Sequence, residues 1–305
     1  MNNARSADTP LLRGCIPILC TPFFDDGAVD LASLEREIAY VIEAGASGVA
    51  ALAIASEGYK LTESERDEIT RVVVATVAGR VPVTVSADGA GTEVALDRAR
   101  RAVRSGADAL MVLPPSFVKP DLAALDDYYR RIGQAVDVPI VIQDAPHLTG
   151  VAMGPALWAK LANEVQTIQY LKVEGTPQGT AISTALTQSD GRLSVFCGWG
   201  GLGMIDALER GCAGSMPAPN FTRHFVEIQA RFEAGDRAGA EAVFAEFLPF
   251  GLWAMQSVDF SVATAKAAFV RHGIFATAHQ RQPAARLDDI SRAQLDRWLT
   301  TDELR

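Results

Sequence analysis

The sequence lacks most of the features that mark membrane, secreted or disulfide-bonded proteins. No apolar run approaches the roughly 20 residues that span a bilayer, and the polar segment 1–10 lacks the apolar stretch of a secretory signal. The four cysteines form no C-x-x-C pair and lie in or beside apolar runs, which predicts buried free thiols. We therefore expect a cytoplasmic protein without a membrane partner.

Other absences narrow the cofactors and partners. The histidines, four in number, are scattered without metal-ligand spacing, so no metal is expected. A formal net charge of −9 argues against nucleic acid as a partner. It allows a small anionic substrate if positive charge is concentrated locally. No G-x-S-x-G motif is present, which excludes the simplest serine hydrolase.

Short apolar runs recur through the first 216 residues and predict the fold class. Most are continuously apolar, which is typical of parallel strands that are covered on both faces. The predicted strands are Cys15–Cys20, Gly48–Ile54, Val81–Ser86, Ala107–Leu113, Val138–Ile142, Ile168–Val173, Ser194–Cys197 and Ala213–Met216.

Helical patterns with clear starts separate these strands. Asp30 and Thr92 are each placed to cap a helix, and Thr62 with Glu65 forms a capping box. Three helices are expected to end alike, with a glycine and then immediately a strand; the glycines are Gly45, Gly106 and Gly211. A motif that recurs at the same structural point indicates a repeated β-α unit.

Eight such units in about 220 residues predict a (β/α)₈ TIM barrel, with a doubly wound sheet as the alternative. After Pro219 the strand signals stop and helical segments continue to the end of the chain. We therefore predict a barrel of residues 1–222 and a C-terminal helical extension of residues 223–305. The expected helices of this extension are 224–234, 237–255, 260–271 and 288–299.

One predicted strand carries both an amine and a carboxylate. Alternation in a strand places Lys172 and Glu174 on the same face, with their β-carbons roughly 6–7 Å apart. Within a barrel, desolvation favours the neutral amine that imine formation needs, whereas an ionised carboxylate nearby favours the ammonium form. Either Glu174 is protonated at rest or another donor holds its charge. The alternative is a strand-end lysine that simply reaches water.

A G-x-G-x-x-G sequence begins at Gly198, after a predicted strand, but does not indicate dinucleotide binding. The fingerprint requires an acidic residue about 20 positions later, and position 223 is Arg. Backbone amides near Gly198 and Trp199, where a helix begins, remain candidates for holding a carboxylate.

In order and spacing, several segments resemble the superfamily of dihydrodipicolinate synthase and N-acetylneuraminate lyase. The likeness covers nearly the whole chain, and its clearest segments are Cys20–Phe23, Pro114–Pro120, Leu171–Lys172 and Cys197–Trp199. The resemblance implies a Schiff-base-forming lyase in which Lys172 forms the imine with a 2-keto acid. It also implies a homo-oligomer of paired barrels, usually a tetramer, and no cofactor, because the imine is itself the electron sink.

Departures from the family pattern bear on the substrate. The Gly-Thr-Thr-Gly-Glu motif that holds the pyruvyl carboxylate becomes residues 53–57 here, with Ala55, Ser56 and Glu57 and without either threonine. The proton-relaying tyrosine of strand five is replaced by Gln143, which cannot relay a proton. Condensation of pyruvate with aspartate semialdehyde is therefore not expected.

Two further family positions are changed. The tyrosine that reaches across an interface is replaced by Phe117, and the arginine that binds a second carboxylate is replaced by Leu148. The altered set resembles a smaller branch that includes L-2-keto-3-deoxyarabonate dehydratase. This likeness implies loss of water from a 2-keto-3-deoxy sugar acid.

In this interpretation Lys172 and Glu174 are the catalytic residues. Ser56 and the nearby backbone at Ala55 and Glu57 hold the C1 carboxylate, and Gln143 contacts the carboxylate or a hydroxyl. Two alternatives remain open. One is a retro-aldolase that uses the same lysine, and the other is a keto-acid-binding barrel without turnover.

Overall fold

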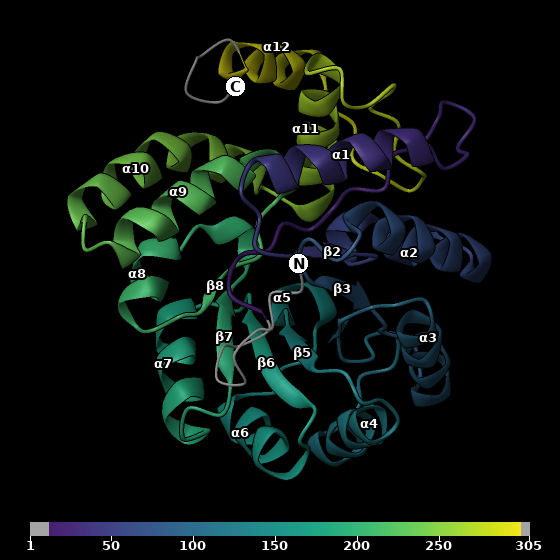
Figure 1. The fold of residues 1–305 in the computed structure, drawn as a ribbon, viewed down its shortest axis with the longest axis vertical. Helices are drawn as coiled ribbons and strands as arrows, with labels where there is room; N and C mark the ends of the chain where they lie inside the picture. The colour runs from purple at the N-terminus through teal and green to yellow at the C-terminus, as the bar shows by residue number, and fades with distance from the viewer. Residues whose placement is uncertain (1–11, 300–305) are drawn as a thin grey trace.

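The computed structural model describes residues 12–299, and its centre is a sheet of eight parallel strands. The strands are β1 (Gly14–Cys15), β2 (Val49–Ala51), β3 (Val83–Ser86), β4 (Ala109–Val112), β5 (Ile140–Asp144), β6 (Ile168–Val173), β7 (Ser194–Cys197) and β8 (Gly214–Ser215). They pair in the order β1-β8-β7-β6-β5-β4-β3-β2. A parallel bridge between Ile18 and Ala50 joins the segment after β1 to β2. The sheet thus curls into a TIM barrel (Figure 1), and the doubly wound alternative is wrong.

Helices surround this sheet and continue after its last strand. The longer helices are α1 (Leu31–Glu43), α2 (Glu63–Val77), α3 (Thr92–Arg104), α4 (Leu122–Gln134), α6 (Pro155–Glu164), α7 (Gln178–Gln188), α9 (Thr222–Glu233), α10 (Arg237–Ala254), α11 (Val258–Arg271) and α12 (Asp289–Trp298). Shorter ones are α5 (Pro146–Thr149), α8 (Met204–Glu209) and the 3₁₀ turns η1 (Ile54–Ser56), η2 (Gly58–Lys60), η3 (Trp199–Gly201) and η4 (Pro219–Phe221).

Four of these helices, α9–α12, follow β8. The first of them, α9, packs against β1, and α10–α12 continue the chain beyond it (Figure 1). The edge-to-face contact of Tyr40 with Phe269, at 5.5 Å between ring centroids, holds α11 against α1. The boundary at residues 222/223 between barrel and extension remains a prediction.

Most predicted helix boundaries are confirmed. The Asp30 side chain accepts a hydrogen bond from the Ser33 N–H, and Thr62 with Glu65 forms the complete capping box. The exit glycines Gly45, Gly106 and Gly211 have φ values of +94°, +97° and +89°, the left-handed conformation that glycine adopts without steric cost. The expected cap at Thr92 is wrong by one residue, because Gly91 occupies the N-cap position and Thr92 begins the helix.

The first two strands are shorter than predicted. The first ends at Cys15 instead of Cys20, and the second ends at Ala51 instead of Ile54. Leu52 has a φ of +62°, which turns the chain out of the extended conformation, and the turn η1 then begins at Ile54. The apolar run is continuous, so its composition gives no sign of this turn.

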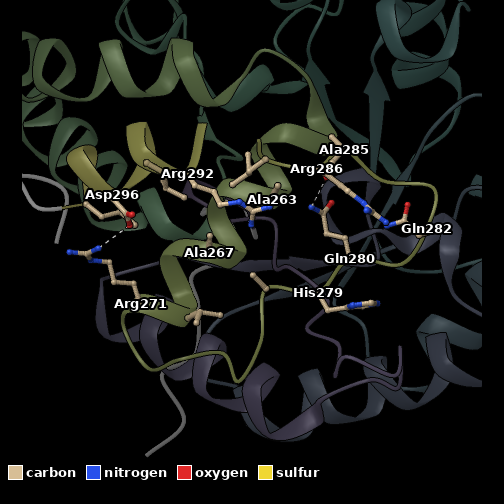
Figure 2. Close-up of a pocket in the computed structure, with 15 residues that line it drawn as sticks. Ala263, Ala267, Arg271, His279, Gln280, Gln282, Ala285, Arg286, Arg292 and Asp296 are labelled. Atoms are coloured by element: carbon tan, nitrogen blue, oxygen red, sulfur yellow. Dashed lines mark hydrogen bonds and ion pairs between the residues drawn. The ribbon is translucent and has the colours of Figure 1, made fainter. Parts of the chain in front are cut away.

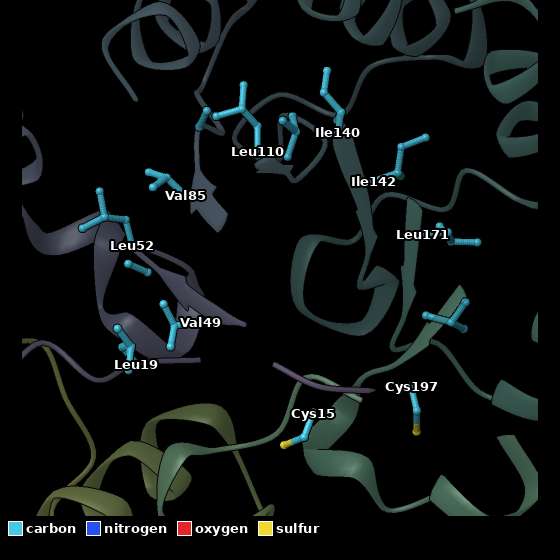
Figure 3. Close-up of a cluster of buried hydrophobic side chains, with 14 of the residues drawn as sticks. Cys15, Leu19, Val49, Leu52, Val85, Leu110, Ile140, Ile142, Leu171 and Cys197 are labelled. Atoms are coloured by element: carbon cyan, nitrogen blue, oxygen red, sulfur yellow. The ribbon is translucent and has the colours of Figure 1, made fainter. Parts of the chain in front are cut away.

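Both faces of the sheet are buried, as the continuous apolar runs predict. Outward side chains such as Val49, Leu110 and Ile142 pack under the helices (Figure 3). Inward side chains such as Met111, Tyr170 and Phe196 fill the barrel. The barrel interior is therefore a packed core below the level of the candidate site.

Within residues 12–299, no helix has the length and apolar character needed to cross a bilayer.

Candidate active site

Strand β6 places an amine and a carboxylate side by side at its C-terminal end. Lys172 Nζ lies 2.8 Å from Glu174 Oε1, and each residue is only 5% exposed. The intervening Val173 points outward into the core beneath the helices. The predicted shared face of Lys172 and Glu174 is therefore confirmed, and Lys172 does not extend into solvent.

Strand β5 adds a second donor to the same carboxylate. Gln143 pairs in register with Lys172, and its Nε2 donates to Glu174 Oε1 at 2.7 Å. The sequence left open whether Glu174 is protonated or held by another donor. The structure supplies that donor, because Glu174 Oε1 is contacted by both the amine and the amide. Two donors on one buried oxygen fix the carboxylate side chain in place.

These three residues line a pocket at the C-terminal end of the strands. Its volume of about 50 Å³ has room for only a few atoms. The remaining walls are mostly apolar and comprise Ile18, Ala53, Ile54, Ala55, Leu148, Trp199, Gly200, Met216, Pro217, Ala218, Met255, Val258 and Ser261. An apolar enclosure strengthens electrostatic interactions within it because little water is present to screen them.

An adjoining pocket of about 560 Å³ extends outward from the first. The two pockets share the wall residues Ala53, Ile54, Leu148 and Val258. The outer pocket carries more oxygen atoms, from Tyr59, Asp88, Ser116, Thr149, Ser257 and Asp259. Together the two pockets offer a small inner space at the amine and a larger outer space, both with mostly apolar walls.

The predicted carboxylate-binding residues occupy different positions around the turn η1. Ala55 lines the inner pocket, whereas Ser56 and Glu57 are 1% exposed and are not among its wall residues. The Ser56 N–H donates to the Ala53 carbonyl at 3.1 Å, and its hydroxyl oxygen has no partner within residues 12–299. A substrate-binding role for Ser56 and Glu57 remains a prediction.

Glu57 is the centre of a buried ion network that links η1 to the C-terminal helices. Its Oε1 lies 2.5 Å from Lys266 Nζ and its Oε2 lies 3.0 Å from Lys60 Nζ. Lys266 also donates to the His279 carbonyl at 2.9 Å and is completely buried. Burial lowers the pKa of Lys266, and the attraction of Glu57 opposes that shift.

Lys266 was not predicted as a functional residue. The signal was available, because Lys266 is a single cation in the otherwise uncharged segment 260–270. Its partner Glu57 has a φ of +55°, an uncommon conformation for a residue other than glycine. The Lys266–Glu57 ion pair therefore holds the chain in a left-handed turn directly after the pocket segment.

Gly198 and Trp199 lie beside the catalytic pair after β7. A Cβ added to Gly198 would come within 2.4 Å of Glu174 Cγ and 3.2 Å of Lys172 Cε. Trp199 lines the pocket and packs edge-to-face on His147, with ring centroids 4.1 Å apart. Gly198 therefore provides space for Lys172 and Glu174, while Trp199 forms part of the wall.

A second carboxyl group lies close behind the pocket. Asp144 follows Gln143 in β5, and the Glu174 N–H donates to its carbonyl at 2.9 Å. Burial raises the pKa of Asp144 from 3.8 to about 7, and the nearby Glu174 adds to the shift. Its side chain borders a separate surface pocket with Trp158 and Pro177. The Asp144 carboxyl group therefore lies outside the pocket that Lys172 and Glu174 line.

The remaining wall residues of the inner pocket come from the C-terminal helices. Met255, Val258 and Ser261, at the junction of α10 and α11, close one side of the pocket. Their contribution was not predicted, because an apolar helix end carries no signal of what it will cover. Within residues 12–299, no three His, Cys, Asp or Glu residues group as a metal site would require.

Comparison with known proteins assigns the family. Residues 11–302 match the model of the dihydrodipicolinate synthetase family. L-2-keto-3-deoxyarabonate dehydratase from Azospirillum brasilense is 33% identical over 297 residues, which cover 95% of this chain and 94% of the relative. 4-Hydroxy-tetrahydrodipicolinate synthase from Methylococcus capsulatus is 31% identical, covering 76% of this chain and 80% of the relative.

A solved structure gives the same result. Dihydrodipicolinate synthase from Rhodopseudomonas palustris superposes with a TM-score of 0.88 at 30% identity, covering 95% of this chain and 98% of that chain. The protein belongs to the dihydrodipicolinate synthetase family. This membership supports a lyase of the Schiff-base class at the level of the family.

Proposed function

We propose that the protein is a hydro-lyase that removes the C4 hydroxyl group of a 2-keto-3-deoxy sugar acid through an imine on Lys172. The observation that carries this proposal is the contact of Glu174 Oε1 with both Lys172 Nζ, at 2.8 Å, and Gln143 Nε2, at 2.7 Å. This contact supports the proposal, because it brings a carboxylate, a group able to transfer a proton, next to the amine, while the neighbouring strand carries an amide that does not titrate.

The first half of the reaction forms the imine. The neutral amine of Lys172 attacks the C2 ketone, and the carbinolamine loses water to give a protonated imine. Glu174 accepts the ammonium proton before the attack and returns a proton to the departing hydroxyl group. The protonated imine then withdraws electrons from C2, which acidifies the protons on C3.

The second half eliminates the C4 hydroxyl group. A base removes one C3 proton, and the electron pair of that bond forms the C2–C3 double bond of an enamine. The enamine expels the C4 hydroxyl as water with a proton from an acid. Glu174 serves both steps in turn, since no phenol is present at position 143. Hydrolysis of the imine releases the dehydrated keto acid, with a net loss of one water molecule and no cofactor.

The two adjoining pockets suit such a substrate. The inner pocket takes the keto-acid head, with the Ala55 backbone and the Ser56 turn directed at the C1 carboxylate and Gln143 within reach of it. The outer pocket takes the hydroxylated tail, whose partners include Asp88, Ser116 and Thr149. Trp199 and the backbone that follows Gly198 form the opposite wall of the inner pocket.

The carbon count of the product separates dehydration from retro-aldol cleavage. A panel of C5 and C6 2-keto-3-deoxy acids is incubated with the protein, and the products are analysed by mass spectrometry. Dehydration gives a keto acid of unchanged carbon number that is one water lighter. Release of pyruvate or another shortened keto acid would contradict the dehydratase proposal and favour the aldolase.

A keto-acid-binding barrel without turnover is tested by trapping the imine. Borohydride added with substrate should attach the reduced substrate to Lys172. Binding without this adduct, together with no product, would support the non-catalytic alternative.

We further propose a homo-oligomer, arranged as a dimer of dimers, in the cytoplasm. The apolar residues Phe117 and Val118, which are 89% and 74% exposed, supply a surface for pairing. Residues 223–305 form the proposed extension, whose residues Met255, Val258 and Ser261 help to enclose the pocket. Sedimentation velocity measures the assembly, and a monomer at micromolar concentration would contradict it.

A further inference from the structure

A further pocket lies outside the barrel, between α11, residues 278–287 and α12 (Figure 2). Its volume is about 550 Å³, which is the size of a typical small-molecule site. One wall is the small-residue face of α11, with Ala263 and Ala267, and Leu287 and Leu295 form part of the rest. The rim is polar and contains His279, Gln280 and Gln282.

Three arginines give this pocket a positive charge. Arg271 is neutralised by Asp296 at 3.2 Å. Arg292 has the fully exposed carboxylate of Asp289 at 4.0 Å, and the charge of Asp288 also acts on it. For Arg286, no carboxylate lies within 4.0 Å anywhere in residues 12–299. Within the described residues the pocket therefore presents two guanidinium groups without a close carboxylate partner, in a chain whose net charge is −9.

The charge and shape of the pocket define the ligand that fits it. Guanidinium groups form paired hydrogen bonds with carboxylate and phosphate oxygens. An apolar alanine floor suits a short carbon skeleton, and two guanidinium groups suit two negative charges. We propose that this pocket is an effector site for a small organic dianion, either a dicarboxylate or a phosphate monoester.

The same helix connects this pocket to the catalytic one. Ala263 and Ala267 of α11 face the arginine pocket, whereas Val258 and Ser261 line the catalytic pocket. On the same helix, Lys266 donates both to the His279 carbonyl and to Glu57.

A dianion that draws residues 279–286 toward α11 thus acts on the His279 carbonyl, which accepts from the same Lys266 ammonium group as Glu57 does. Because Glu57 immediately follows η1, the effect reaches the turn that borders the catalytic pocket. Dianion binding to the arginine pocket and its effect on η1 both involve residues other than Lys172 and Glu174. Both can therefore be measured whichever reaction the protein catalyses.

Isothermal titration calorimetry tests the binding step, with succinate and inorganic phosphate as the dianionic probes and acetate as the monoanionic control. Succinate or phosphate should bind, and acetate should bind more weakly. A preference for either dianion supports the proposal and identifies the head group. Absence of saturable heat with both dianions would overturn it.

Variants locate the binding. Arg286→Gln should weaken dianion binding about tenfold, as expected for the loss of one charge-assisted contact, and Arg286→Gln/Arg292→Gln should weaken it further. Both side chains are exposed, so the fold should persist, and circular dichroism checks this. The matched control is Arg192→Gln, which removes the same charge from an exposed site elsewhere. Equal binding by the double variant and the wild type would place the dianion in another site.

Hydrogen exchange tests the coupling step. The bound dianion should slow amide exchange in residues 276–287 and also in residues 54–60. The second effect should disappear in Arg286→Gln/Arg292→Gln under the same conditions. Protection confined to residues 258–299 would show that the site binds without acting on η1, and would overturn the effector role.

Discussion

Glu174 Oε1 lies 2.8 Å from Lys172 Nζ, so strand β6 supplies the amine and the residue directly after the strand supplies the carboxylate. The alternation of a strand fixes this pair, and Gln143 on the next strand fixes the carboxylate from a second side. Gln143 stands where the family pattern has a tyrosine, and the proposed function assigns proton transfer to Glu174 instead. The first three predictions concern this pair.

Lys172→Ala should remove the imine. We expect activity to fall by at least about 10³-fold, as for loss of a covalent nucleophile, and borohydride to leave no substrate adduct. Mass spectrometry of the intact protein measures the adduct. Thermal unfolding should still be cooperative, because the vacated space is small. A persisting adduct in Lys172→Ala would assign the imine to another amine.

Glu174→Gln should separate imine formation from elimination. An amide cannot carry the proton, so turnover should fall about 10²–10⁴-fold, while trapping at Lys172 remains measurable. Glu174→Asp, which keeps the carboxyl group but shortens its reach, is the comparison. Unchanged turnover in Glu174→Gln would mean that another group carries the proton.

Gly198→Ala should displace the catalytic pair. The new methyl group would lie within 2.4 Å of Glu174 Cγ and 2.8 Å of the Val173 carbonyl oxygen, so the side chain or strand must shift. We expect a lower kcat and a stability loss of about 1–3 kcal/mol, as for overpacking. Gly91→Ala is the matched control, because a Cβ there meets no atom within 4 Å. Equal kcat values for the two variants would show that Lys172 and Glu174 tolerate the methyl group.

Lys266→Met should destabilise the protein by about 3–5 kcal/mol. The substitution keeps the length of the side chain but leaves the buried Glu57 with Lys60 as its remaining charged partner. Urea unfolding measures the loss. Adding Glu57→Gln should recover part of it, since the uncompensated charge is then gone. A change below about 1 kcal/mol for Lys266→Met would mean that the pair has little energetic weight.

Asp144 should make the free energy of unfolding fall as the pH rises from about 4 to about 7. Its pKa is raised from 3.8 to about 7 by burial and by Glu174. Between these values the folded protein binds more protons than the unfolded chain, so the free energy of unfolding decreases with pH. The full effect is at most about 4 kcal/mol and is reached above pH 7.

The variant Asp144→Asn isolates this contribution. It should match the wild type near pH 4 and exceed its free energy of unfolding at pH 8. Urea titrations at both pH values measure the difference. A difference between variant and wild type that is independent of pH would contradict the assignment.

Much of the fold follows from local patterns. The eight strands, the glycine exits and the final helices are specified by short-range periodicity and turn chemistry, and they appear where they were predicted. The ends of β1 and β2 were predicted too late in the chain, and for β2 the reason is that the left-handed Leu52 lies within a continuous apolar run. The cap at Thr92 was misplaced because Gly91 can occupy an N-cap position as readily as a hydroxyl-bearing residue.

In the candidate site, too, some features follow from local sequence and others only from tertiary packing. The sequence by itself determined that Lys172 and Glu174 share a face, because alternation along one strand is a local property of the backbone. Only the tertiary structure decided that Gln143 donates to Glu174, that Lys266 pairs with Glu57 across 209 positions, and that α11 closes the pocket. Such contacts depend on how helices and strands that are far apart in the sequence pack together. The composition and residue spacing of a single segment do not specify that packing.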